Sequence, residues 1–235
     1  MRNIKYYFEN EQGNSADYGI LFPTLPVITL GQEQTELKEI AGRKGTLAVD
    51  TGIYSDTVIQ NSVELRVRKR GDLDPAYLRA VQWIRKSRKV VYKDAENYFY
   101  KVKKVEVGEP SHDTDYNCTF DFTFTCEPGV YISGGEREME KAEVLYNPYS
   151  LCEPIYYITG EGYCILIVNG KTMNANVGQN LTIDTERMLA YREDGTLQNT
   201  QVTGDYEDLY LQPGENTITI TSGFDLKIVP NWRRL

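Results

Sequence analysis

The chain has 235 residues, of which 40% are hydrophobic and 26% charged, and its formal net charge at pH 7 is −8. This length suits two domains of roughly 100–130 residues, each with a core that needs no disulfide or metal. The acidic balance argues against general nucleic-acid binding through phosphate neutralisation, and the longest apolar runs, CILIV and IYYI, are far too short to span a membrane.

The N-terminal part of the chain combines irregular segments with one alternating strand. The start, MRNIKYYFENEQG, holds no apolar segment of signal-peptide length, so we expect synthesis and folding in the cytoplasm. In GILFPTLPVITL, Pro23 and Pro26 exclude a central strand. A glycine-punctuated loop follows, EIAGRKGTLAVDTGIYSDTVIQ, and then SVELRVRKR, which places Val63, Leu65 and Val67 on one face of a strand.

The segment DLDPAYLRAVQWIRKSRK predicts a helix. Asp74 can cap it and Pro75 suits its first helical position. Its apolar face consists of Tyr77, Leu78, Val81 and Ile84. The basic residues that follow complement the C-terminal dipole of the helix, so we interpret the local basic clusters as solvated faces.

Two long strands follow the helix and predict a hairpin. The first, NYFYKVKKVEVGE, changes phase and therefore predicts a bulge near Lys103–Lys104. The second, YNCTFDFTFTC, places Cys118 and Cys126 on the same face as its three phenylalanines, as buried apolar residues. Eight strand steps separate these two thiols by roughly 26 Å, which excludes a disulfide between them. Cys152 and Cys164 have no metal-type spacing.

A proline- and glycine-marked stretch at residues 128–135 predicts an interdomain connection, which gives domains 1–135 and 136–235. The second domain shows short strands with turn signals at Asn169–Gly170, Asp194–Gly195 and Pro213–Gly214, typical of a β-sandwich or jelly roll. Its last three strands take their inner faces from three pairs of residues: Leu209 and Leu211, Ile218 and Ile220, and Leu226 and Ile228. We expect Trp232 to dock on the N-terminal domain or on a neighbouring subunit, with Arg233 and Arg234 meeting acidic surface.

Motifs that carry chemistry are scarce. The one histidine, His112, lies in the polar turn EPSHDTDYN, and Ser111 and Asp113 cannot complete a catalytic triad by adjacency alone. The same stretch begins like a calcium loop but lacks the required glycine and final glutamate. No phosphate or dinucleotide loop is present. We therefore expect no enzymatic activity, no metal site and no cofactor.

The order of several segments resembles one family. EIAGRKGTLAVDTGIYSDTVI precedes a long strand, the helix DPAYLRAVQWI follows, and then come VVYKDAENYFYKVKKVEV, the Phe-rich strand, NPYSLCEPIYYITGEG, LTIDTE, LQPGENTITIT and DLKIVPNWRRL. This succession resembles the distal tail proteins (Dit) of long flexible-tailed bacteriophages and of prophages in Gram-positive bacteria. The resemblance spans essentially the whole chain.

The resemblance implies a mainly β fold with one helix: an N-terminal β-domain with the helix and a C-terminal domain that is a galectin-like or carbohydrate-module-like β-sandwich. It implies a structural virion protein, assembled in the host cytoplasm as a homohexameric ring at the tail tip. The ring joins the tail tube protein to the tail-associated hub protein, anchors receptor-binding proteins in phages with a baseplate, and lets DNA pass through its lumen. No membrane, cofactor or catalysis is implied.

By resemblance, the segments Gly19–Leu30 and Gly42–Gly52 are expected near subunit contacts. The candidate contact residues are Arg43, Lys44, Tyr54, Trp232, Arg233 and Arg234. A rival interpretation is a host-recognition protein of the carbohydrate-binding-module type, with Tyr156, Tyr157, Tyr206 and Tyr210 as exposed aromatics. Longer family versions carry carbohydrate-binding insertions, for which this chain has no room.

Overall fold

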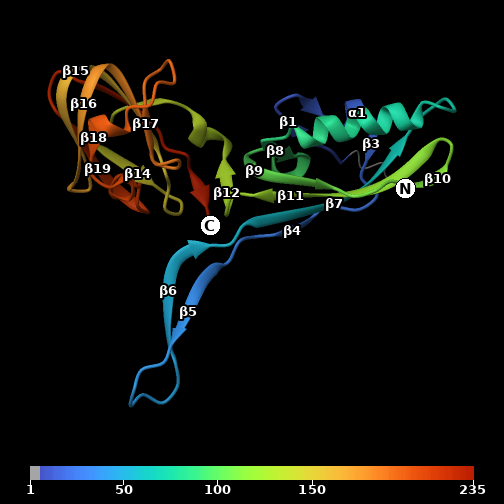
Figure 1. Ribbon diagram of the computed structural model, residues 1–235, viewed down its shortest axis with the longest axis horizontal. Coiled ribbons are helices and arrows are strands. Elements are labelled where there is room, and N and C mark those ends of the chain that lie inside the picture. Colours follow the sequence, from blue (N-terminus) through green and yellow to red (C-terminus); the bar gives the residue numbers. More distant parts are fainter. Residues whose placement is uncertain (1–5) are drawn as a thin grey trace. The chain divides into compact units, whose positions relative to one another are not determined.

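The computed structural model describes residues 6–235, a mainly β protein in which that range holds a single α-helix (Figure 1). The predicted fold class, all-β with one helix, is confirmed. Residues 1–5, the beginning of the stretch for which the sequence predicts no signal peptide, lie outside the described residues. The chain divides into two compact units, one of Met1–Val130 with Leu235 and one of Tyr131–Arg234, whereas the sequence places a boundary between residues 135 and 136.

An antiparallel sheet forms the N-terminal unit. Its strand order is β2-β1-β8-β9-β11-β7-β3, and in addition β4 pairs with β7 and β10 with β11. The strands are β1 (Phe8–Asn10), β2 (Gly13–Asn14), β3 (Ile20–Leu21), β4 (Val27–Thr29), β7 (Thr57–Arg66), β8 (Lys89–Tyr92), β9 (Tyr98–Val107), β10 (Ser111–Thr114) and β11 (Asn117–Cys126). Pro23 and Pro26 lie between the two short edge strands β3 and β4, as their missing N–H groups require.

The long strands follow their sequence patterns. Strands β7 and β11 pair over ten residues, and every second residue of β11 from Cys118 to Cys126 is buried. On β9, Val102 opposes Cys126 and Lys104 opposes Thr125, so Lys103 is the extra residue. The predicted bulge is therefore confirmed.

Helix α1 (Leu73–Arg85) packs on this sheet through Ala80, Trp83 and Ile84. Its predicted start is wrong, because the helix begins at Leu73 and Asp72 occupies the N-cap position without a side-chain capping bond. Leu78 is also misassigned to the buried face. It is 59% exposed because it lies about 200° around the helix from Ala80.

A second antiparallel sheet forms the C-terminal unit. Its order is β13-β20-β15-β16-β17, and in addition β14 pairs with β19, β19 with β15 and β18 with β16. The strands are β13 (Met139–Glu140), β14 (Val144–Asn147), β15 (Ile155–Val168), β16 (Lys171–Asp184), β17 (Leu189–Tyr191), β18 (Val202–Thr203), β19 (Gly214–Ile220) and β20 (Asp225–Val229). The short 3-10 helices in the described range are Ser15–Tyr18, Lys93–Ala95, Ser133–Glu136, Asn199–Gln201 and Tyr206–Leu209.

The β15–β16 hairpin organises this unit. Its turn residues Asn169 and Gly170, predicted as a hairpin turn, have φ values of 51° and 80°, which fit a type I′ turn. One end of β15 pairs with β20 and the other with β19. Between these ends, Gly160 leaves room for the ring of Phe224, which lies 2.3 Å from the position a Cβ would take. Strand β15 therefore pairs at both ends of a curled sheet, which surrounds one hydrophobic core.

The predicted C-terminal strands are partly confirmed. Ile218, Leu226 and Ile228 are buried on β19 and β20, as expected. The strand expected around Leu209 and Leu211 is wrong, although both side chains are fully buried. Leu209 ends a 3-10 helix and Leu211 forms an isolated bridge with Cys152, because an alternating pair of leucines also fits a short turn that packs on a core.

Candidate functional site

A hairpin arm continues from β4 and β7 beyond the N-terminal sheet (Figure 1). It consists of β5 (Glu33–Lys38) and β6 (Leu47–Tyr54), which pair with each other and form a separate two-stranded sheet. The sequence predicts a loop here. That prediction is wrong because Leu47, Val49 and Thr51 have strand propensity, which the flanking glycines obscured.

The arm exposes apolar side chains. All of β5 is exposed, with Leu37 at 68%, and Ile40 and Ile53 are 47% and 59% exposed. An isolated two-stranded hairpin is only marginally stable in water. The arm therefore has the character of a segment that is completed by packing against another surface.

The root of the arm is fixed by close backbone contacts. The Ser55 N–H donates to the Gln32 carbonyl at 3.0 Å, and the Gly31 N–H to the buried Thr57 hydroxyl at 3.4 Å. A Cβ on Gly31 would lie 1.9 Å from the Ser55 carbonyl oxygen. Only glycine permits this approach, so residue 31 determines how the arm leaves the sheet.

An apolar strip lies at the adjacent sheet edge. It comprises Leu25, Val27, Ile28 and Leu30, which are 63%, 60%, 40% and 52% exposed. Within the described residues, β4 pairs only with β7, so its other backbone edge has no strand partner. An exposed edge with apolar side chains is a ready surface for association.

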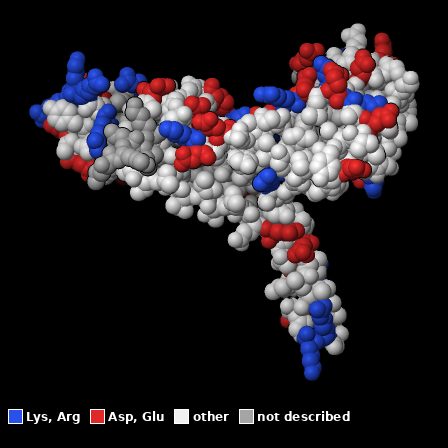
Figure 2. Space-filling view, turned by 180° about the vertical axis from the view of Figure 1, so that it is seen from behind, with Lys and Arg blue, Asp and Glu red and all other residues white. Residues whose placement is uncertain are grey.

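The candidate contact residues of the N-terminal unit belong to the arm. Arg43 and Lys44 are exposed at its turn, and Figure 2 shows basic side chains gathered at the far end of the hairpin. Tyr54 ends β6, and its hydroxyl lies 3.4 Å from Glu33 Oε2 across the hairpin. The structure thus places these three residues on one projecting element.

The C-terminal candidates are integrated in the C-terminal unit. There β21 (Arg233–Arg234) pairs with β12 (Val130–Ile132). Trp232 is half-buried and packs against the core of this unit, and its contact with a neighbouring subunit stays a prediction. Arg233 is 7% exposed, whereas Arg234 is exposed and lies over the Tyr149 ring at 5.4 Å.

Arg233 holds a bidentate ion pair. Its Nη1 and Nη2 donate to Glu153 at 3.0 and 2.9 Å, and its Nε donates to the Leu151 carbonyl at 2.9 Å. Burial works to lower the pKa of Arg233, but Glu153 and Tyr131 outweigh it and raise that pKa. Arg233 therefore meets an acidic partner, as expected, but this partner belongs to its own unit.

The tyrosines of the rival carbohydrate-binding interpretation are largely packed. Tyr156 is fully buried and its hydroxyl donates to the Leu209 carbonyl at 2.8 Å. The Tyr206 hydroxyl is buried without a hydrogen-bond partner in the described residues. Tyr157 and Tyr210 are half-buried. Tyr156 therefore packs as an ordinary core residue of its strand and does not offer the exposed ring that the rival interpretation requires.

The one histidine, His112, lies on an exposed surface. His112 lies on β10 rather than in a turn, and the pairing of β10 with β11 is irregular at Asp113. The Nε2 of His112 lies 3.4 Å from Asp74 Oδ1. Within residues 6–235, no group of three or more His, Cys, Asp or Glu residues could hold a metal ion, and no helix is long and apolar enough to cross a membrane.

Sequence reasoning missed the apolar content of these surfaces. The segment Gly19–Leu30 was singled out only through the resemblance, and Leu37, Ile40 and Ile53 were not singled out. A usable signal exists, because isolated apolar residues among Glu, Gln and Lys cannot build a core of their own.

The fold as a whole is shared with a solved structure. The crystal structure of the SPP1 Dit protein (gp 19.1), described as a paradigm of the hub adsorption apparatus in phages that infect Gram-positive bacteria, superposes with a TM-score of 0.63. The match covers 95% of this chain and 97% of that chain at 11% sequence identity. No protein-family model and no curated protein sequence matches the chain.

Proposed function

We propose that the chain is a structural component of a phage tail tip, a distal tail protein that assembles into a homohexameric ring. One observation carries this proposal: the arm and the apolar strip expose seven large apolar side chains on a fold that matches SPP1 Dit over nearly its whole length. These residues are Leu25, Val27, Ile28, Leu30, Leu37, Ile40 and Ile53. A closed ring needs two different complementary patches on each subunit, and a projecting arm supplies one of them.

In this proposal the ring joins the tail tube protein to the hub protein and DNA passes through its lumen. It provides the anchoring surface for receptor-binding proteins where a baseplate is present. The role is structural, without catalysis, and its place is the virion tail tip after assembly in the host cytoplasm. The likeness to SPP1 Dit, itself described as part of a hub adsorption apparatus, supports this placement.

The solution mass of the chain tests the proposal directly. Light scattering is expected to give a species of about six times 26.9 kDa, either alone or together with the hub protein. A chain that stays monomeric in both conditions contradicts the ring.

Two point variants separate assembly from folding. Leu37→Gln removes an exposed apolar side chain of the arm and is expected to abolish the ring without changing the thermal midpoint of the monomer. Leu197→Gln is the matched control, since Leu197 is 63% exposed on the C-terminal unit. An equal effect of both substitutions would show that the arm has no special part in assembly.

A shortened variant tests the arm as a whole. Gln32 and Ser55 are hydrogen-bonded across the hairpin, so an Asn-Gly dipeptide can replace residues 33–54 as a two-residue turn. We expect this variant to fold and to remain monomeric.

A further inference from the structure

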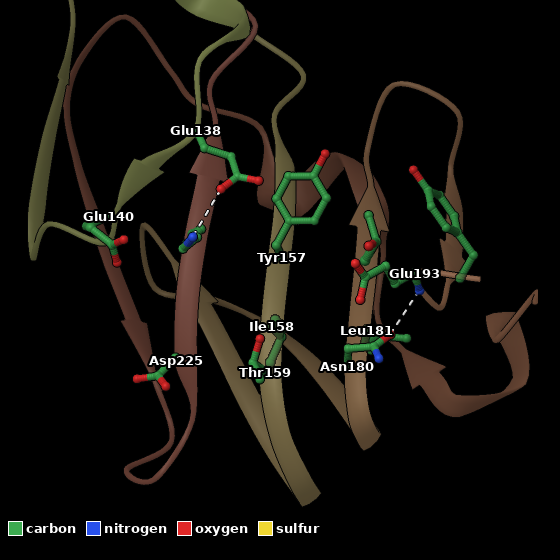
Figure 3. Close-up of a pocket in the computed structure, with 12 residues that line it drawn as sticks. Glu138, Glu140, Tyr157, Ile158, Thr159, Asn180, Leu181, Glu193 and Asp225 are labelled. Atoms are coloured by element: carbon green, nitrogen blue, oxygen red, sulfur yellow. Dashed lines mark hydrogen bonds and ion pairs between the residues drawn. The ribbon is translucent and has the colours of Figure 1, made fainter. Parts of the chain in front are cut away.

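An open groove of about 650 Å³ lies on the outer face of the C-terminal sheet, across β13, β20, β15, β16 and β17 (Figure 3). Strand register explains its composition. Lys227, Tyr157, Thr182 and Tyr191 are direct cross-strand neighbours in one row. Asp225, Thr159 and Asn180 form the next row. The inward neighbours on the same strands fill the core, so these side chains all project outward.

The floor of the groove holds an unpaired polar group. Thr182 is only 5% exposed, and its hydroxyl, which makes no hydrogen bond within residues 6–235, is open to water in the groove. Tyr157 and Tyr191 flank it from the strands on either side, roughly 10 Å apart by strand spacing. The two half-buried tyrosines therefore bound a slot whose base offers a hydroxyl that no protein group satisfies.

The rim of the groove is acidic. Four carboxylates line it, from Glu138, Glu140, Glu193 and Asp225, against the single cation Lys227, a balance of −3. Lys227 Nζ already forms an ion pair with Glu138 Oε2 at 3.2 Å. Glu140 is the direct cross-strand neighbour of Lys227 and, like Glu138, raises the pKa of that lysine. Figure 3 shows Tyr157 between Glu138 on one side and Glu193 on the other.

Both tyrosines have pKa values raised mainly by burial. Burial raises the pKa of Tyr157, and Tyr191, Glu138 and Asp184 raise it further. Burial also raises the pKa of Tyr191. Both rings therefore stay neutral and present electron-rich faces beside carboxylates, the combination that attracts organic cations.

We propose that this groove binds a basic peptide segment of a partner protein, with a lysine or arginine side chain in the slot between Tyr157 and Tyr191. The cation would lie against the ring faces, the rim carboxylates would accept its hydrogen bonds, and the Thr182 hydroxyl would accept one from the floor. The groove extends over five strands, which suits an extended segment rather than a single small ion. A neutral saccharide would leave the acidic rim without a counter-charge.

The groove proposal rests on the proposed tail-tip function in one respect, since that function supplies the setting in which such a partner would meet the chain. Fluorescein-labelled tetralysine is the probe, measured by fluorescence anisotropy with the full chain. We expect binding that weakens with salt and that tetraglutamate and chitotetraose do not compete for. The double variant Glu140→Gln and Glu193→Gln is expected to weaken binding about tenfold.

A matched double variant, Glu207→Gln and Glu215→Gln, removes two exposed carboxylates that do not line the groove. It is expected to change affinity less than twofold. Thr182→Val, which keeps side-chain shape and removes the hydroxyl, is expected to weaken binding about threefold with the fold intact by circular dichroism.

Equal losses in the two double variants would overturn the proposal, because binding would then follow net charge alone. Absence of tetralysine binding, or competition by chitotetraose, would overturn it as well. The anisotropy measurement does not depend on oligomeric mass. A negative binding result therefore leaves the ring proposal intact, and a monomeric chain leaves the groove proposal intact.

Discussion

The Arg233–Glu153 ion pair gives the sharpest test of how the C-terminal end of the chain is held. Substitution of Arg233 by Met removes the guanidinium but keeps much of the aliphatic stem. The Glu153 carboxylate, whose side chain is 21% exposed, would then lose the two hydrogen bonds that it accepts from Arg233. The Leu151 carbonyl would lose its donor.

The expected cost follows from burial. Breaking a fully buried pair by removing one partner costs about 3–5 kcal/mol. Partial access of water to Glu153 reduces this to about 2–3 kcal/mol by the same reasoning. For a unit of roughly 100 residues, such a loss lowers the melting temperature by about 10–20 °C.

Calorimetry of the full chain measures this change in the transition of the C-terminal unit. The double variant Arg233→Met with Glu153→Met leaves no unpaired charge, so it is expected to be more stable than the single variant. Lys227→Met is the control, because its partner Glu138 is about half exposed, and it should leave the midpoint unchanged. The reasoning is refuted if Arg233→Met behaves like this control, or if the double variant is the least stable of the three.

Three further predictions concern local features. Gly31→Ala should distort the root of the arm, because its Cβ would meet the Ser55 carbonyl, and limited proteolysis should then cut the arm faster than in the wild type. Tyr92→Phe should cost about 1–3 kcal/mol in urea unfolding, since the buried Asn61 Oδ1 would lose its 2.8 Å donor; a neutral result would contradict the buried geometry. The four buried cysteines should react with a thiol reagent at pH 8 only after unfolding. Burial raises the pKa of Cys126 to about 12, so its contribution to stability should be complete below about pH 9 and fall as pH rises towards 12.

The long strands were predictable because each carries its own pattern. On β11 a single face bears Phe120, Phe122 and Phe124, and no other register buries all three. The bulge at Lys103 follows from the same logic, since a change of phase within one strand requires an extra residue. The hairpin turn at Asn169–Gly170 was predictable because few dipeptides accept two positive φ values.

The errors arose where tertiary contacts override local signals. Asp74 and Pro75 are good residues for a helix start, but Leu73 is buried against the sheet and brings the first turn forward. Leu209 and Leu211 alternate like a strand, yet the Tyr156 hydroxyl donates to the Leu209 carbonyl and keeps it in a short 3-10 helix. Trp232 gave no sign of which surface it would contact, because that depends on where Tyr149 and the sheet core lie.

The candidate surfaces were harder to predict than the cores, for a physical reason. A buried face repeats with the period of its strand, whereas an exposed apolar residue has no internal partner to set a period. Leu37 lies directly opposite Ala48 on the arm, and neither meets a core. Their sequence context, rich in Glu, Gln and Lys, is typical of a solvated segment.

The exposed apolar side chains of the arm link the stability of the arm to assembly. In the isolated chain, Leu37 and Ile53 gain little from folding, so the hairpin depends on cross-strand pairs alone. Covering such side chains in a ring would add roughly 1.5–3 kcal/mol for each one fully buried. Assembly would therefore stabilise the arm and the arm would stabilise the assembly. Hydrogen exchange is expected to show weak protection of β5 and β6 in the monomer and strong protection in the ring, and equal protection in both states would contradict this coupling.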